Sequence, residues 1–161
     1  MDEDLAERAR ENLVPFEAVS VTHGDTTILT LPPSDLIYVN AAVVAPPAHW
    51  LVSLRPGGRM IFPWRPSEDV AVTMLITRGQ DEFSARPLMP ALFIPCIGAS
   101  VPQQILKGPD RAAARTIRSV WLTGDRNPDE SAVAIFRDVW FSDNPAAPIT
   151  VAAQFPISRP C

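Results

Sequence analysis

The carboxyl end of a strongly apolar stretch carries the residues best placed to bind a ligand. Asn40 and Ala41 come at the end of the run that begins at Asp35, and they are small or polar where the run itself is bulky. Open α/β sheets bind ligands at the carboxyl ends of their strands, where small side chains leave room. Asn40 and Ala41 are therefore candidate binding residues, although close packing beneath the following loop would require the same residue types.

A second strand end is predicted at Gly24 and Asp25, which stop the alternating segment 17–25. Taken alone, this pair indicates a turn in which the Asp25 carboxylate accepts hydrogen bonds from its own backbone.

The other reactive side chains do not form a catalytic group. His23 precedes the predicted turn and His49 lies in a short predicted helix, so both are expected at the surface. Cys96 lies in an apolar run and is expected to be a small core residue, while Cys161 is the last residue. Two distant cysteines favour neither a disulfide nor a metal site. The sequence therefore assigns no catalytic residue and no metal ligand.

Hydrophobic patterning predicts the elements that position these residues. In the first half they are a helix over 2–13, strands over 17–25 and 35–43, a short helix after Pro47, a turn at 56–58 and a strand over 59–64. The run 35–43 is nearly continuous in apolar residues, as is typical of a parallel strand covered on both faces. Trp50 and Leu51 of the short helix are expected to face the sheet.

The second half is predicted to be richer in antiparallel strands. Its elements are a strand pair within 69–79 and 82–99, a helix over 110–120, and strands over 119–123 and 132–142. Four aromatic residues are expected in the core or at an interface, with stacking on a ligand as the alternative: Trp121, Phe136, Trp140 and Phe141.

Composition limits the partners that the protein can have. The 161 residues suit one domain with a real core. The net charge is −4, from 14 basic and 18 acidic residues without a block of like charge, so nucleic acid is not expected as a partner. No apolar run reaches the length of about 18 residues that a membrane span needs, and no signal-type start is seen, so we expect a cytoplasmic protein without a membrane partner.

The order of these segments resembles the protein-L-isoaspartate O-methyltransferase family, whose members are S-adenosylmethionine-dependent enzymes of the Rossmann-like class. The family pattern has a strand ending in Gly-Asp, a strand of the form D-x-I-x-V-x-A-A, then L-x-P-G-G-R and F-x-P-x-x-G. Here these stand at residues 24–25, 35–42, 54–59 and 93–98. The resemblance covers roughly residues 2–98, so we predict a partial methyltransferase domain over 1–98 and a C-terminal extension over 99–161, packed on the same domain.

This resemblance implies an α/β fold with a Rossmann-like class I methyltransferase sheet, truncated at the N-terminus, and antiparallel C-terminal strands. It implies S-adenosylmethionine as cofactor, with Asp25 at the adenine amino group, the backbone near Gly24 shaping the pocket, and Asn40 and Ala41 near the methionine end. The implied reaction is methylation of isoaspartyl carboxylates in damaged proteins. Because the carboxylate is already the nucleophile, the missing catalytic group is no argument against it.

One part of the family pattern is missing. The family holds its cofactor with a G-x-G-x-G-type loop, but no G-x-G occurs here and the first glycine is Gly24. The strands that would border the two segments 18–22 and 36–41 are missing as well. Without those border strands, we expect the two segments to lie in one α/β sheet. Without the glycine loop, we expect that the chain alone neither binds the cofactor nor catalyses the reaction.

Two alternatives remain open from the sequence. The methyl acceptor could be another small molecule or macromolecule, because the extension after Gly98 is unlike the family core. The chain could instead be a degenerate, non-catalytic module that binds a partner through an exposed sheet edge. Homo-oligomerisation is also left open.

Overall fold

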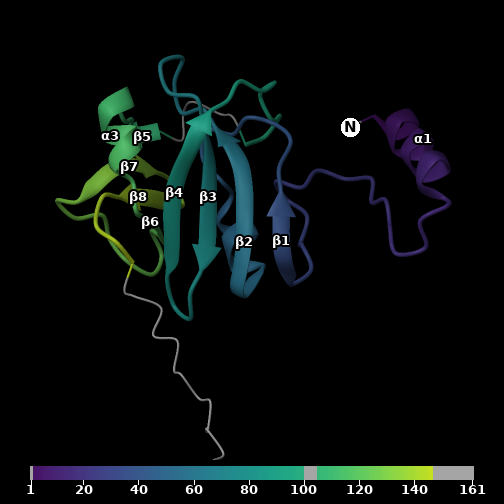
Figure 1. Ribbon diagram of the computed structural model, residues 1–161, viewed down its shortest axis with the longest axis horizontal. Coiled ribbons are helices and arrows are strands. Elements are labelled where there is room, and N and C mark those ends of the chain that lie inside the picture. Colours follow the sequence, from purple (N-terminus) through teal and green to yellow (C-terminus); the bar gives the residue numbers. More distant parts are fainter. Residues whose placement is uncertain (1, 100–104, 147–161) are drawn as a thin grey trace, which may run out of the picture.

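A computed structural model describes residues 2–99 and 105–146. Within these residues the strands form one eight-stranded sheet in the order β1-β2-β3-β4-β6-β8-β7-β5 (Figure 1). The strands are β1 Ser34–Tyr38, β2 Leu54–Trp64, β3 Val72–Arg78, β4 Phe83–Pro90, β5 Ile105–Lys107, β6 Ser119–Leu122, β7 Ala132–Phe136 and β8 Val139–Ser142. The helices are α1 Glu3–Leu13, α2 Ala48–Val52 and α3 Arg111–Thr116.

The strands β1 and β2 pair in parallel and are joined by α2, which confirms the predicted strand–helix–strand unit. Residues Ile37 and Tyr38 of β1 lie opposite Met60 and Ile61 of β2. The helix begins after Pro47, as predicted, and buries Trp50 and Leu51 against the sheet. This unit brings the carboxyl ends of β1 and β2 to the same edge.

The strand predicted over 35–43 is shorter and less covered than expected. It ends at Tyr38, and the side chains of Leu36 and Tyr38 are 62% and 63% exposed. As the last strand of the sheet, β1 has one free edge. The exposure of Leu36 and Tyr38 shows that no described element covers the face that carries them. The prediction of a strand buried on both faces was therefore wrong.

The strand predicted over 17–25 does not form. Residues 18–22 make no ladder, and they do not share a sheet with 36–41. A strand needs a neighbour for its backbone groups, and no described strand borders this segment.

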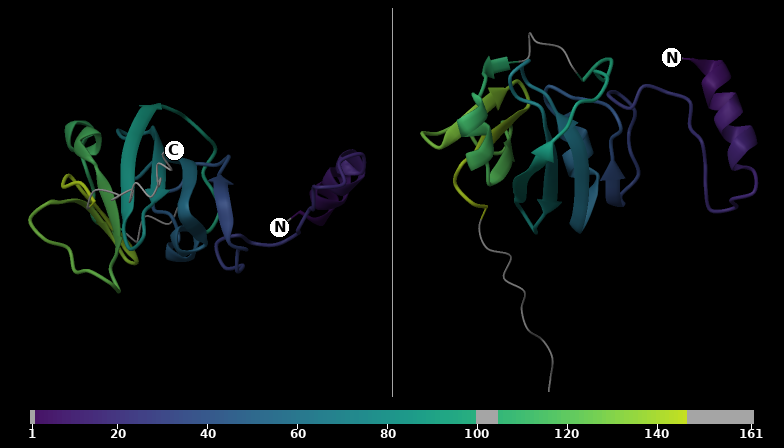
Figure 2. Two further views of the ribbon diagram at one scale, coloured as in Figure 1. Left: turned by 60° about the horizontal axis from the view of Figure 1, so that its bottom comes forward. Right: turned by 45° about the horizontal axis from the view of Figure 1, so that its top comes forward.

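The helix α1 does form, capped by Asp2, which accepts a hydrogen bond from the Leu5 amide. It buries no residue and lies apart from the sheet at the end of an extended segment (Figures 1 and 2).

The strands β3 and β4 form the predicted antiparallel pair, closed by a hydrogen bond from the Gly79 amide to Glu82 O (2.7 Å). The strand β4 ends at Pro90 instead of continuing through residue 99. Residues 94–99 run beside 42–44, where Ala42 and Pro95 form a parallel bridge.

The C-terminal elements differ from the prediction mainly in length. The helix expected over 110–120 spans only α3, which Asp110 caps by accepting a hydrogen bond from the Ala113 amide (2.7 Å). The single strand expected over 132–142 is divided into β7 and β8 by a turn at Arg137 and Asp138. The two strands then pair with each other, with β8 also bordering β6.

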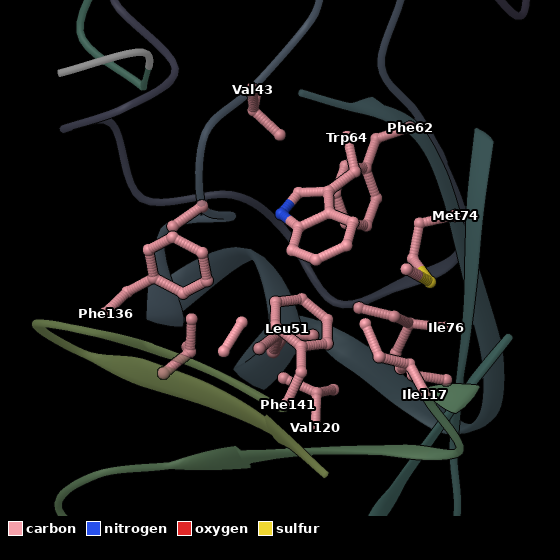
Figure 3. Close-up of a cluster of buried hydrophobic side chains, with 14 of the residues drawn as sticks. Val43, Leu51, Phe62, Trp64, Met74, Ile76, Ile117, Val120, Phe136 and Phe141 are labelled. Carbon is pink, nitrogen blue, oxygen red and sulfur yellow. The ribbon is translucent and has the colours of Figure 1, made fainter. Parts of the chain in front are cut away.

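The core lies where the sheet coils over itself and brings β7 and β8 onto β2 (Figure 3). The Trp64 ring is 4.9 Å from the Phe141 ring and 6.4 Å from the Phe136 ring, measured between centroids. Its indole Nε1 donates a hydrogen bond to Val44 O (2.8 Å). Strands from both sides of residue 98 therefore share one hydrophobic core.

Replacing this indole tests its place in the core. In Trp64→Phe the buried Val44 carbonyl loses its indole donor and a cavity opens beside Phe141, so unfolding free energy should fall by about 2–4 kcal/mol. Trp121→Phe is the matched control, because Trp121 is only half-buried and its loss should cost about 1 kcal/mol or less. Urea unfolding followed by circular dichroism measures both, and equal losses would contradict the central position of Trp64.

Candidate functional site

Three segments meet beyond the carboxyl end of β1. The first two are 40–45 and 94–99, which are joined by hydrogen bonds from Ala42 N to Ile94 O (2.8 Å), Cys96 N to Ala42 O (2.7 Å) and Val44 N to Ala99 O (2.9 Å). The third is the turn at 24–29, which packs on Gly98. Residues that are far apart in sequence thus form one surface at the edge where α/β sheets bind ligands.

The Asp25 side chain organises the turn. Its Oδ1 accepts hydrogen bonds from the Thr27 hydroxyl (2.7 Å) and from the Thr27 amide (2.9 Å). These two bonds hold the pKa of the Asp25 carboxyl below its ordinary value. The turn that the residues alone indicated is therefore confirmed. Because the folded-state pKa is depressed, the stabilisation is present above the ordinary pKa and is lost as the pH falls through the lowered one.

The helix α2 fixes the turn from the other side. The carbonyl of Thr26 accepts hydrogen bonds from Trp50 Nε1 (2.8 Å) and from His49 Nε2 (3.0 Å), which carries the proton in this tautomer. His23 is exposed, as predicted, whereas His49 lies at the surface but holds a backbone partner. Sequence reasoning missed these positioning contacts, because they join residues more than twenty positions apart.

Two glycines allow the close packing in this region. Gly98 has a φ of +89°, and a Cβ there would lie 2.7 Å from Thr27 Oγ1. A Cβ on Gly24 would lie 2.2 Å from Leu29 Cδ1. Packing against the Leu29 side chain is thus one reason for a glycine at position 24, and its contact with a cofactor stays a prediction.

The thiol of Cys96 is half-buried and free. Burial raises the pKa of this thiol above its ordinary value, and the negative charge of Asp25 raises it further. A thiol with a raised pKa is largely protonated at neutral pH, so Cys96 is a poor nucleophile. Asp25 belongs to the turn whose Thr27 packs on Gly98 of the segment 94–99.

The predicted binding residues Asn40 and Ala41 follow β1 directly. Asn40 is exposed and Ala41 is half-buried, next to the bridge between Ala42 and Pro95. A hollow of about 200 Å³ adjoins this bridge, and it is lined by Ala42, Val44, Arg65, Pro66, Ser67, Glu68 and Pro95. The two predicted pairs, Gly24–Asp25 and Asn40–Ala41, therefore belong to segments that meet beyond the carboxyl end of β1.

The aromatic residues of the C-terminal half serve the core, as expected. Phe136, Trp140 and Phe141 are buried. Trp121 stacks on Trp140 with ring centroids 6.3 Å apart, and the Arg126 guanidinium lies 4.4 Å from the Trp121 centroid. The chain's own arginine thus covers the ring that a ligand would need for stacking.

A family model described as Protein-L-isoaspartate(D-aspartate) O-methyltransferase matches residues 2–101. The chain belongs to this family. The match includes all three segments of the candidate site and ends before β5, so the C-terminal strands lie outside it.

The chain is also similar to known proteins in sequence and in fold. The chain is 35% identical over 99 residues to a protein-L-isoaspartate O-methyltransferase of Bradyrhizobium, a match that covers 58% of this chain and 45% of that protein. A solved family structure from Plasmodium falciparum, in complex with S-adenosyl-L-homocysteine, has a TM-score of 0.51 at 18% identity, covering 59% of this chain and 49% of that one. A second structure, named protein-L-isoaspartate O-methyltransferase, has a TM-score of 0.56 at 16% identity, covering 87% and 53%.

These likenesses confirm the predicted Rossmann-like methyltransferase fold class, with antiparallel strands in the second half. The chain spans about half the length of the relatives it matches.

The residues of this chain do not fit the whole cofactor. No G-x-G occurs in the sequence, so the backbone loop that could approach a cofactor closely is missing. The Asp25 Oδ1 is already engaged by Thr27, and Leu29 fills the space beside Gly24. The described residues therefore do not by themselves supply all the contacts that a bound cofactor would need.

The packing of Gly98 can be separated from its backbone strain. Gly57 also has a positive φ of +80°, but nothing lies within 4 Å of the place that a Cβ would take there. Gly57→Ala should therefore cost only the strain of about 1–2 kcal/mol. Gly98→Ala should cost more, since its Cβ also displaces Thr27. Urea unfolding measures both, and equal costs would show that the contact with Thr27 is unimportant.

The raised pKa of Cys96 can be tested by alkylation with iodoacetamide, which needs the thiolate. The peptide containing Cys96, followed by mass spectrometry, should react more slowly at neutral pH than N-acetylcysteine. In Asp25→Asn the side-chain carbonyl keeps both Thr27 hydrogen bonds but the charge is lost, so the pKa should fall and the reaction should become faster. An unchanged rate would show that the Asp25 charge does not act on the thiol.

Proposed function

We propose that this chain forms part of an S-adenosylmethionine-dependent enzyme that methylates a carboxylate, namely the isoaspartyl carboxylate of damaged proteins. The observation that carries the proposal is the family match over residues 2–101, which contains all the segments gathered at the end of β1. The chain's contribution is one wall of the site, because its own residues do not fit the whole cofactor.

Each segment has its own part in the proposed site. Gly24, Asp25, Asn40 and Ala41 border the cofactor. The segment 94–99 faces the methyl acceptor. Its apolar side chains Ile94 and Ile97 are 84% and 93% exposed, and they exclude water when the acceptor packs against them. Removing water strengthens the hydrogen bonds and dipoles that orient a carboxylate.

The setting follows from the same proposal. A free thiol at Cys96 fits a reducing compartment, so we place the protein-repair reaction in the cytoplasm. Among the described residues, no helix is long and apolar enough to cross a membrane.

A different methyl acceptor is the second candidate, and one observation favours it. A hollow of about 210 Å³ lies between the site and the C-terminal strands, with Thr27, Pro47 and Gly98 on one side and Phe136 and Asp138 on the other. Residues from β7 and its turn thus border the site although they lie outside the family match, and they could select another acceptor.

Calorimetric titration with S-adenosylhomocysteine tests the role of the chain as one wall. The 161-residue protein alone should show no micromolar binding, because it lacks the glycine loop. A micromolar dissociation constant would show that these residues suffice for the cofactor.

The acceptor is tested on a chimaera in which the unmatched part of the Bradyrhizobium relative is fused upstream of Asp2. This protein should transfer a labelled methyl group to an isoaspartyl peptide and not to the same peptide with ordinary aspartate. Binding of S-adenosylhomocysteine without such transfer would overturn the isoaspartyl assignment and favour another acceptor.

A further inference from the structure

A third hollow, of about 380 Å³, lies beside α3, where Val72 of β3 pairs with Pro90 of β4. Its walls come from the connection between β2 and β3, from the end of β4 with the residues after it, and from α3. The first two walls lie inside the matched region 2–101, whereas α3 lies outside it. Ligand sites usually measure about 300–1,000 Å³, so this hollow suits a ligand of modest size.

The buried part of the lining is apolar. Val70 and Ala114 line the hollow and are 2% and 1% exposed, while Leu92 beside them is 76% exposed. Ala114 is the last of three consecutive alanines in α3, whose short side chains leave this space open. Covering the open leucine and the buried residues with a further apolar group is favourable. The hollow therefore favours a ligand with an apolar body.

One arginine of the lining is already held by the protein. The Arg111 Nε donates a hydrogen bond to Asp69 O (2.6 Å), and its Nη2 lies 3.7 Å from Asp69 Oδ1. This contact connects α3 with the connection between β2 and β3, so it holds two walls of the hollow together. Two further charged side chains remain in the lining, Glu68 and Arg115.

The side chains of Glu68 and Arg115 are exposed, and neither has an ion-pair or hydrogen-bond partner within residues 2–99 and 105–146. They line the same hollow without pairing with each other. A ligand with a net charge would compensate one of them and bring a like charge to the other, which is unfavourable. A ligand with one charge of each sign compensates both.

We propose that this hollow binds a free amino acid with an apolar side chain, in its zwitterionic form. Its carboxylate lies at Arg115, because a guanidinium binds a carboxylate through two parallel hydrogen bonds. Its ammonium group donates to the Glu68 carboxylate, and its side chain covers Val70 and Ala114. This inference goes beyond the proposed function and does not depend on it, since binding requires neither the cofactor nor methyl transfer.

L-leucine is the first probe. Titration of the 161-residue chain, followed by amide NMR at about pH 6.5, where an α-amino group is charged, should give a dissociation constant of about 1 mM or tighter. The shifts should concentrate in residues 68–72, 91–92 and 111–115. Glycine lacks the apolar body and should bind at least about fivefold more weakly. The absence of saturable shifts in these residues, or equal binding of glycine, would overturn the proposal.

Two derivatives of leucine separate its charges. N-acetylleucine keeps only the carboxylate and leucinamide only the ammonium group, so each should bind at least about threefold more weakly than leucine. Arg115→Gln should weaken the binding of N-acetylleucine and not that of leucinamide, whereas Glu68→Gln should do the reverse. The matched controls are Arg137→Gln and Glu130→Gln, two exposed side chains outside the hollow, and they should change no affinity.

The pattern across probes and variants decides the assignment. Equal binding of leucine and both derivatives would exclude recognition of the two charges. Weakening of both derivatives in both variants would contradict the assigned orientation, since each variant removes only one charge. Tighter binding of leucyl-leucine than of leucine would replace the free amino acid by a short peptide. Exposed substitutions of this kind rarely affect stability, and unchanged core amide signals should show that the variants remain folded.

Discussion

The backbone of residues 42–44 is hydrogen-bonded on both sides, and the rest of the structure depends on this arrangement. On one side the Val43 amide donates a hydrogen bond to Pro63 O (2.9 Å) at the end of β2. The Val43 carbonyl accepts a second hydrogen bond from the Arg65 amide (2.8 Å). On the other side the segment 94–99 takes the alternate groups. A buried backbone must have partners, and here those partners are the core strand β2 and the loop of the candidate site.

This double pairing connects stability with the site. Trp64 follows directly after the paired Pro63 and binds the carbonyl of Val44 through its indole, so the core holds the position of 42–44. That segment positions 94–99, and Gly98 in turn supports the turn at Asp25. The candidate site is therefore an extension of the core, although its residues come from loops.

Local signals in the sequence were sufficient for some elements and not for others. The helix α1, the helix after Pro47 and the pairing of β3 with β4 follow from nearby residue types, and all are confirmed. The strand over 17–25 was wrong because an alternating pattern shows what a strand would bury but cannot supply its neighbour. The predicted site residues gather at one edge, yet the contact of Thr26 with Trp50 depends on tertiary packing, which periodicity does not reveal.

The sequence separation between Trp64 and its aromatic neighbours affects how the protein folds during synthesis. The rings that enclose Trp64 belong to Phe136 and Phe141, so the core cannot close on the ribosome until β8 has been synthesised and has emerged. Contacts of such high sequence separation also slow folding. The nascent first half, which contains β1 and β2, therefore remains incompletely folded until that point. Its apolar strands are exposed during this time and can be bound by chaperones.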